Sequence, residues 1–208
     1  MKLSVKQTIA IDYLEDTNTN VILYGGGAGG GKSMLGAYWV LKQCLKYPKT
    51  RYVIGRSRLK NLKETTLRSL FEVCSMQGLT ANVDFTYNET KSLITIHQTK
   101  SEILLKDLFH YPSDPNFDSL GSMEITGAFI DEATEITTTA YNVIQSRMRY
   151  NLDKHGLTPK LLMTCNPSKG WIYSEFYKKF KDGTLDDNKQ FVQSLVTDNP
   201  NISKHYIN

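Results

Sequence analysis

The chain has 208 residues and a formal net charge of +4 at pH 7, enough for one α/β domain with a substantial core, or one domain with a small appendage. Its mildly basic balance permits a nucleic-acid partner without requiring one. The 3 cysteines and 4 histidines are scattered without metal-ligand spacing, so we expect reduced thiols and no zinc site. No apolar run approaches membrane-spanning length and no secretory signal is evident, so we expect no membrane association.

Stretches with apolar residues at helical spacing alternate along the chain with short apolar runs typical of buried strands. In chain order we predict a helix at 4–15, a strand at 21–24, a helix at 32–46, a strand at 51–55, a helix at 59–76, a β-hairpin or meander at 82–108, a strand at 127–132, a helix at 137–150, a strand at 160–167, a helix at 172–180 and a strand at 191–196. This alternation predicts an α/β fold with a mostly parallel sheet and helices on both faces.

The segment VILYGGGAGGGKSMLGAYWV contains a match to the P-loop pattern G-x-x-x-x-G-K-[ST], between a predicted strand and a predicted helix. Backbone N–H groups free of β-carbons can curl around phosphate oxygens, and the following helix points its positive end at the same charge. The residues predicted to bind the phosphates of ATP are Gly26, Gly27, Ala28, Gly29, Gly30, Gly31, Lys32 and Ser33, with Ser33 also a ligand of Mg²⁺. The alternative is a flexible glycine loop, which leaves the agreement of strand, Lys-Ser pair and helix unexplained.

Two adjacent acids, Asp131 and Glu132, close the predicted strand GAFIDE. Asp131 fits the carboxylate that holds Mg²⁺ in P-loop enzymes, and Glu132 is a candidate for orienting and deprotonating the attacking water. Together they favour hydrolysis over phosphoryl transfer to a small substrate. The alternative is that both acids cap the next helix.

Polar residues at two further places are candidates for nucleotide contact. Thr164 and Asn166 end the predicted strand 160–167, at the sheet edge where a γ-phosphate is sensed, although Asn-Pro can also start a simple turn. Gln7 precedes the first strand, and its amide offers adenine one donor and one acceptor. The alternative for Gln7 is a solvated helix residue.

In order and spacing these motifs resemble the N-terminal ATPase domain of bacteriophage terminase large subunits, over nearly the whole chain. The resemblance rests on VKQTIAIDYL, YGGGAGGGKS, VIGRSR, GAFIDEATEI, LLMTCNP, GWIYSEFYKKF and SLVTDNPNISKHYI. It implies a P-loop NTPase of the ASCE type, the class with an additional catalytic glutamate. It also implies that Thr164 and Asn166 link hydrolysis to movement and that Gln7 reads adenine.

The same resemblance implies ATP hydrolysis with Mg²⁺ that drives double-stranded DNA into a procapsid. The implied partners are the portal protein, a small terminase subunit and further copies of the chain in a ring, with a monomer possible in isolation. The implied location is the cytoplasm of the infected bacterial host. Two alternatives stay open: a DEAD-box-like helicase ATPase domain, and a nucleotide-gated assembly module that does not hydrolyse ATP.

The chain departs from the family pattern in its nuclease region. Large subunits carry a second, RNase H-like nuclease domain, but no late cluster of acids follows the ATPase motifs here. We therefore expect a P-loop ATPase core at 1–180, a tail or lid at 181–208 leading to a nuclease domain absent from this chain, and no nuclease activity.

The position of the arginine finger is a second departure, because residues 113–127 contain no basic residue. The remaining candidates are Arg56, Arg58, Arg147 and Arg149. Of these four we favour Arg56, acting in its own site. The alternative for each arginine is a surface salt bridge, which is the commoner role of any single arginine. DNA phosphates are predicted to meet either a first basic group (Lys60, Lys63 and Arg68) or a later one (Lys169, Lys178, Lys179, Lys181 and Lys189), unless these are simply solvated charges.

Overall fold

The computed structural model describes residues 2–27 and 29–198, and its centre is a single eight-stranded sheet. The strands are β1 (Val21–Gly26), β2 (Arg51–Arg56), β3 (Phe85–Asn88), β4 (Leu93–Ile96), β5 (Glu102–Asp107), β6 (Gly127–Ile130), β7 (Lys160–Cys165) and β8 (Lys189–Ser194). They lie in the order β3-β4-β5-β2-β6-β7-β1-β8. All pairs from β5 to β8 are parallel, and β3 and β4 pair antiparallel at one edge.

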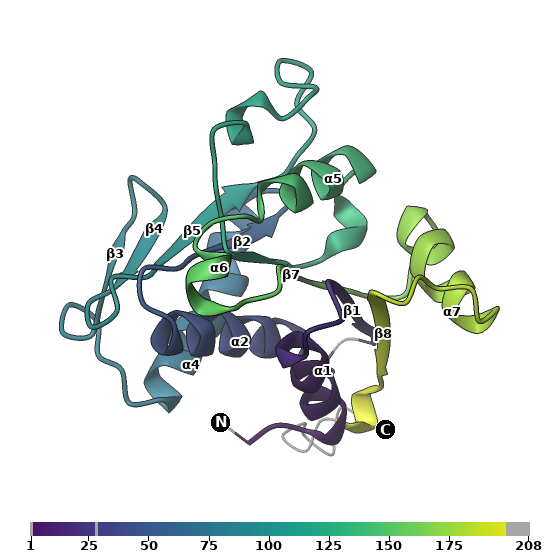
Figure 1. Cartoon of the computed structure of the whole chain (residues 1–208), viewed down its shortest axis with the longest axis horizontal. Coiled ribbons are helices and arrows are strands. Elements are labelled where there is room, and N and C mark those ends of the chain that lie inside the picture. Colours follow the sequence, from purple (N-terminus) through teal and green to yellow (C-terminus); the bar gives the residue numbers. More distant parts are fainter. Residues whose placement is uncertain (1, 28, 199–208) are drawn as a thin grey trace.

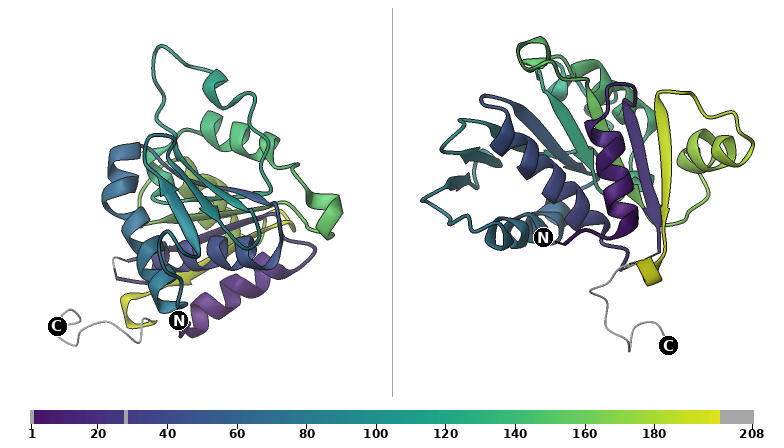
Figure 2. Two further views of the ribbon diagram at one scale, coloured as in Figure 1. Left: turned by 90° about the vertical axis from the view of Figure 1, so that its left-hand side faces the viewer. Right: turned by 60° about the horizontal axis from the view of Figure 1, so that its bottom comes forward.

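Helices cover both faces of this sheet, which confirms the predicted fold class (Figures 1 and 2). The helices are α1 (Val5–Glu15), α2 (Lys32–Lys46), α3 (Leu59–Glu64), α4 (Thr66–Met76), α5 (Thr138–Arg147), α6 (Leu152–His155) and α7 (Lys179–Lys181). Short 3₁₀ turns form η1 (Asp118–Leu120), η2 (Ala133–Glu135) and η4 (Val196–Asp198), and η3 (Tyr173–Lys178) has π-helical bonding. None of the described helices is both long and apolar enough to cross a bilayer.

Two hydrophobic clusters, one on each face, hold the layers together. Alternate residues of β1 separate onto the two faces, as the period of a strand requires: Ile22 and Tyr24 join the cluster under α1, α2 and α4, while Leu23 joins the cluster under α5. The first cluster contains the fully buried Trp39 of α2 and the second contains Ile144 of α5. Since β1 and β7 are buried along their whole length, their carboxyl ends are held rigidly at one edge of the core.

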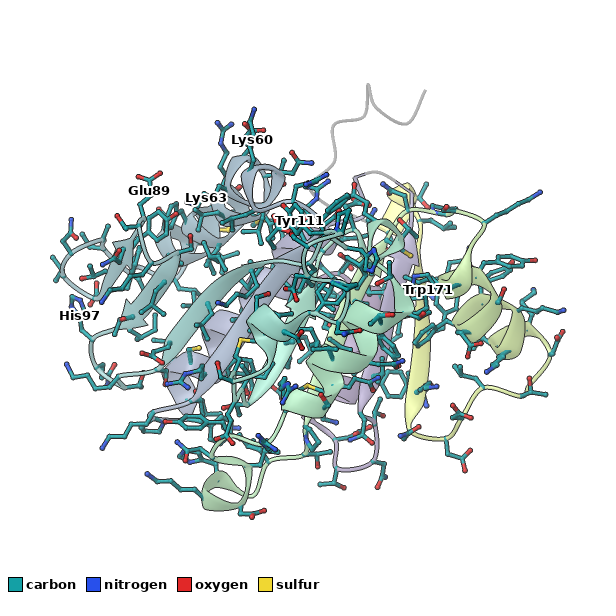
Figure 3. All side chains as sticks on the ribbon, turned by 90° about the horizontal axis from the view of Figure 1, so that it is seen from above. Lys60, Lys63, Glu89, His97, Tyr111 and Trp171 are labelled. Carbon is teal, nitrogen blue, oxygen red and sulfur yellow. The ribbon has the colours of Figure 1, made fainter. Side chains whose placement is uncertain are left out.

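The helix predicted over 59–76 is interrupted, and this prediction is wrong at Thr65. That residue leaves the helical region at φ −123° and ψ −71°, so the chain divides into α3 and α4. Lys60 and Lys63 lie at the surface on α3, on the same side of the molecule as Tyr111 (Figure 3). The predicted helix 137–150 also ends early, at Arg147, because the backbone N–H groups of residues 149 and 150 both donate to the carbonyl of Ile125.

The β-meander predicted at 82–108 is present as β3, β4 and β5. Its last strand pairs in parallel with β2, so the meander extends the main sheet. The final strand spans 189–194, two residues earlier than predicted, because its parallel pairing with β1 begins at Lys189 opposite Val21. It lies within the segment predicted as a tail, and the boundary at residue 180 stays a prediction.

The packing of α2 against β6 generates a stability prediction. A β-carbon added to Gly36 would lie 2.3 Å from the Phe129 ring. Alanine gains about 1 kcal/mol over glycine in helix propensity, but overpacking of a core costs about 1–3 kcal/mol. We expect Gly36→Ala to lower the free energy of unfolding by up to about 2 kcal/mol in urea titrations. The loss should shrink when Phe129→Leu makes room, and a more stable Gly36→Ala variant would contradict this packing.

Candidate active site

The P-loop connects β1 to α2, and its lysine lies inside the loop. The Lys32 ammonium donates to the carbonyls of Gly26 at 3.1 Å and Gly27 at 2.7 Å. It also donates to Oδ1 of Asn166, at 2.9 Å, from the loop after β7. Burial lowers the pKa of Lys32, against the opposing effect of the Glu132 and Asp131 charges. A buried cation that rests on carbonyl oxygens is well placed to exchange them for phosphate oxygens.

Two glycines of the loop are required by their surroundings. A β-carbon on Gly26 would lie 1.6 Å from the carbonyl oxygen of Ser194, so glycine lets β8 pack against the loop. Gly31 has φ +69° and caps α2 in the left-handed region, where glycine carries no steric penalty. Ala28, which is predicted to bind phosphate, lies outside the described residues.

A cavity of about 370 Å³ opens beside the loop. It is lined by Gly29, Gly30, Gly31, Lys32, Ser33, Met34, Glu132 and Asn166. Most of the residues predicted for phosphate binding and catalysis therefore meet around one space. The start of α2, with its positive dipole end, lines the same space, which favours an anionic ligand.

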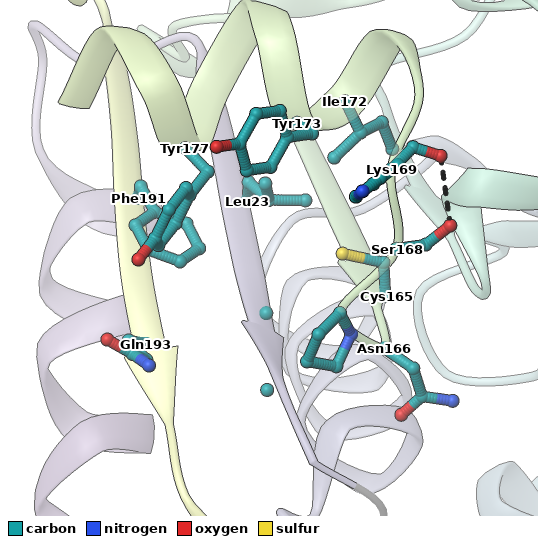
Figure 4. A pocket seen from close by; sticks show the side chains of 13 residues that line it. Leu23, Cys165, Asn166, Ser168, Lys169, Ile172, Tyr173, Tyr177, Phe191 and Gln193 are labelled. Atoms are coloured by element: carbon teal, nitrogen blue, oxygen red, sulfur yellow. Dashed lines mark hydrogen bonds between the residues drawn. The ribbon is translucent and has the colours of Figure 1, made fainter. Parts of the chain in front are cut away.

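A second cavity, of about 420 Å³, lies next to the loop on the face of β1 that carries η3 (Figure 4). Its walls are largely apolar, with Leu23, Ile172 and Phe191 among them, and Tyr173 and Tyr177 overhead. Lys32, Asp131 and Glu132 are missing from its lining. The smaller, polar cavity is therefore the candidate site for a nucleotide.

Asp131 follows β6 and is only 1% exposed. Its carboxylate accepts hydrogen bonds from three hydroxyl groups: Ser33 at 2.8 Å and Thr66 at 2.7 Å bond to Oδ2, and Thr164 at 2.6 Å bonds to Oδ1. Mg²⁺ prefers carboxylate, hydroxyl and water oxygens. The adjacent oxygens of Ser33 and Asp131 thus fit the ligand set of a magnesium ion.

Glu132 has a backbone conformation that side chains seldom adopt, with φ 51° and ψ 52°. Such strain costs about 1–3 kcal/mol and collects at functional sites. Its two carboxylate oxygens each lie 3.4 Å from the Asn166 amide nitrogen, which donates to them. Burial raises the pKa of Glu132 and so does the Asp131 charge, while Lys32 and Arg56 act in the opposite direction. The carboxylate is therefore a stronger base than a solvated glutamate.

Arg56 ends β2 close enough to Glu132 to influence its pKa. Its guanidinium donates to the Thr65 hydroxyl at 2.7 Å and forms an ion pair with Glu135 at 3.4 Å. The other candidate arginines are held elsewhere. The guanidinium of Arg58 lies 3.3 Å from the centre of the Phe109 ring. Arg149 pairs with Glu124, and Nε of Arg147 is buried without a hydrogen-bond partner in the described part of the chain.

Two predicted contact residues are engaged within the protein. The Thr164 side chain is fully buried and turned to Asp131, so it does not line the nucleotide cavity. Both ends of the Gln7 amide are also used: Oε1 accepts from the Ser4 N–H in a capping box and Nε2 donates to the Gly31 carbonyl. Gln7 therefore supports the P-loop here, and its contact with adenine stays a prediction.

Sequence reasoning missed Thr66, because the segment reads as one uninterrupted helix. The only signal was the pair Thr65-Thr66, two β-branched residues with low helix propensity. It also missed Ser194, a fully buried residue of β8 whose hydroxyl donates to the Gly30 carbonyl at 3.3 Å. Nothing in the local sequence connects Ser194 with a loop at the other end of the chain.

Solved structures with this fold include several large terminases. The large terminase of a thermophilic bacteriophage in complex with ADP is similar with a TM-score of 0.75 and 17% identity, over 98% of this chain and 48% of that chain. The same phage protein in complex with ATP-gamma-S is similar with a TM-score of 0.71 and 16% identity, over 99% of this chain and 48% of that chain. The large terminase ATPase domain of Thermus phage P74-26 is similar with a TM-score of 0.62 and 12% identity, over 92% of this chain and 80% of that chain.

Identities this low show a shared fold, and the chain spans about half the length of the thermophilic bacteriophage protein. No curated protein matches the chain. A family model described as phage terminase large subunit matches residues 18–208, which is most of the sequence. The resemblance seen in the motifs is thereby confirmed, and the chain belongs to the phage terminase large subunit family.

Proposed function

We propose that this chain hydrolyses ATP with Mg²⁺ and that hydrolysis moves double-stranded DNA into a procapsid. The observation that carries the proposal is the meeting of Lys32, the Ser33–Asp131 pair and Glu132 around one polar cavity. Family membership supports the packaging role. The ADP and ATP-gamma-S complexes of the thermophilic bacteriophage large terminase support a nucleotide ligand.

Phosphate binding would begin with an exchange of partners at Lys32. Its ammonium leaves the carbonyls of Gly26 and Gly27 and contacts the β- and γ-phosphate oxygens, while loop N–H groups surround the same charge. Ser33 and Asp131 would hold the metal, which supplies charge neutralisation between the phosphates.

Glu132 would then accept a proton from the attacking water. A general base works best when its pKa lies near the working pH, and burial shifts the carboxyl in that direction. Asn166 bonds to Lys32 through its oxygen and to Glu132 through its nitrogen. If Lys32 moved to the phosphates, Asn166 would lose its bond to the Lys32 ammonium. The contact between Asn166 and Glu132 would then differ between the empty and the nucleotide-bound site.

Arg56 is the proposed source of positive charge for the transition state, within its own site. Its guanidinium would have to turn from Glu135 and Thr65 toward the phosphate. For Gln7 to read adenine, the amide would likewise exchange its bonds to Ser4 and Gly31. Thr164 would act through Asp131 and not on the nucleotide itself.

On family grounds we propose three partners: the portal protein, a small terminase subunit and further copies of this chain in a ring. The proposed location is the cytoplasm of the infected host. The proposed domain bounds are a core at 1–180 and a tail beyond it.

For DNA phosphates we favour Lys60, whose side chain is 84% exposed and only distantly paired, at 4.0 Å, with Glu64. In the later basic group, Lys179 and Lys189 are each paired with an acid, at 2.7 and 2.6 Å.

Removal of the Lys32 ammonium tests the binding step. Lys32→Ala should weaken Mg-ATP-gamma-S binding about 10- to 100-fold, because charge-assisted hydrogen bonds of about 1.5–3 kcal/mol are lost. Isothermal titration calorimetry measures the affinity. The matched control is Lys42→Ala, because Lys42 lies on the outer side of α2, where it pairs with Glu15. Parental affinity in Lys32→Ala would rule out the site.

Neutralising the proposed base separates binding from chemistry. Glu132→Gln should bind Mg-ATP-gamma-S like the parent and lower the rate of phosphate release about 10²- to 10⁴-fold. The phosphate-release assay also decides between an ATPase and an assembly module, since a parent chain that binds nucleotide without turnover fits only the module. An unchanged rate in Glu132→Gln would exclude Glu132 as the base.

The raised pKa of Glu132 predicts how this variant responds to pH. A carboxyl whose pKa is higher in the folded than in the unfolded state contributes stability at low pH that is lost as pH rises through the folded pKa. Glu132→Gln should therefore gain stability relative to the parent from about pH 4 to about pH 7.5. Urea titrations at both pH values measure this. The exposed Glu124→Gln serves as control, and a relative stability of Glu132→Gln that falls with pH would contradict the assignment.

A further inference from the structure

The junction between α3 and α4 reaches the metal carboxylate. We propose that Thr66 is a positioning residue that orients Asp131 for Mg²⁺ binding, an inference that rests on the proposed function. Thr66 is the first residue of α4, is completely buried, and donates its hydroxyl to Oδ2 of Asp131 at 2.7 Å.

The distribution of donors on Asp131 gives Thr66 its role. Within residues 2–27 and 29–198, Ser33 and Thr66 share Oδ2, and Thr164 is the one side chain that bonds to Oδ1. If Ser33 turned its oxygen to a metal, the Thr66 and Thr164 hydroxyls would remain, one on each carboxylate oxygen. Two donors on opposite oxygens fix the plane of the carboxylate, whereas one donor leaves it free to rotate. Groups that orient a metal ligand in this way typically contribute about 10- to 100-fold in metal affinity.

The local fold explains how Thr66 comes to face Asp131. Leu62 and Leu67 are buried on either side of the break at Thr65, so both helices are anchored in the core and the junction between them is fixed. This fixed junction aims the buried Thr66 hydroxyl at the end of β6.

The same junction carries a contact to Arg56. The Thr65 hydroxyl accepts from the Arg56 guanidinium at 2.7 Å and donates to the Asn61 carbonyl at 2.8 Å. Adjacent residues at one helix break thus hold the proposed metal carboxylate and the proposed catalytic arginine. The sequence pair Thr65-Thr66, at which the helix breaks, is accordingly part of the proposed site.

The test compares magnesium dependence in three variants. Thr66→Val removes the hydroxyl at similar size, and Thr66→Ser keeps it. The control, Thr126→Val, removes a similarly buried hydroxyl at the far end of β6. That hydroxyl accepts from the Arg51 N–H and donates to the Tyr150 carbonyl. Calorimetric titrations with ADP are run in EDTA and then over a series of Mg²⁺ concentrations. Thermal unfolding without ligand records the stability of each variant.

We expect Thr66→Val to bind ADP in EDTA like the parent and to need about 10- to 100-fold more Mg²⁺ for half of the metal-dependent gain in affinity. Thr66→Ser should restore the parental Mg²⁺ requirement. Thr126→Val should lower the unfolding temperature and leave that requirement unchanged. A Thr66→Val variant with the parental requirement overturns the proposal; if that variant does not fold, Thr66→Ala is judged by the same criterion. A parent chain whose ADP binding ignores Mg²⁺ overturns the proposed function as well, so the two failures are distinguishable.

Discussion

The buried carboxylate of Asp131 is the constraint on which this site depends. A carboxylate taken out of water is costly unless hydrogen-bond donors replace the lost solvent. At 1% exposure Asp131 obtains them from hydroxyls on three elements, Ser33 of α2, Thr66 of α4 and Thr164 of β7. The need to satisfy the charge of Asp131 thus fixes α2, α4 and β7 in position relative to β6.

A second series of hydrogen bonds runs from Lys32 through Asn166 to Glu132. Through the single amide of Asn166 it joins the cation proposed to bind phosphate to the acid proposed to activate water. The strained backbone of Glu132 and its raised pKa fit the same picture, because both destabilise the folded protein in favour of reactivity. A site of this kind is expected to gain stability when its acid is neutralised.

The sequence predicted those parts of the fold that follow from local patterns. Runs such as residues 21–24 are apolar on both faces and indicate buried strands, and the glycine loop with Lys32 predicts the phosphate site. Contacts between distant segments could not be predicted from local patterns. The hydrogen bond from Thr66 to Asp131, for example, joins residues 65 positions apart in the sequence. The register of β8 and the bond from the Gln7 amide to the Gly31 carbonyl were missed for the same reason, since each depends on a partner that only the folded chain brings near.

The central claim is that the P-loop main chain and Lys32 bind the phosphates of ATP beside Asp131 and Glu132. The most direct measurement is a crystal structure with Mg²⁺ and a non-hydrolysable ATP analogue. We expect the Lys32 ammonium to have left the carbonyls of Gly26 and Gly27 for the β- and γ-phosphate oxygens, in the polar cavity next to Glu132. An analogue seated in the apolar cavity under η3, or a lysine still on the two carbonyls, would contradict it.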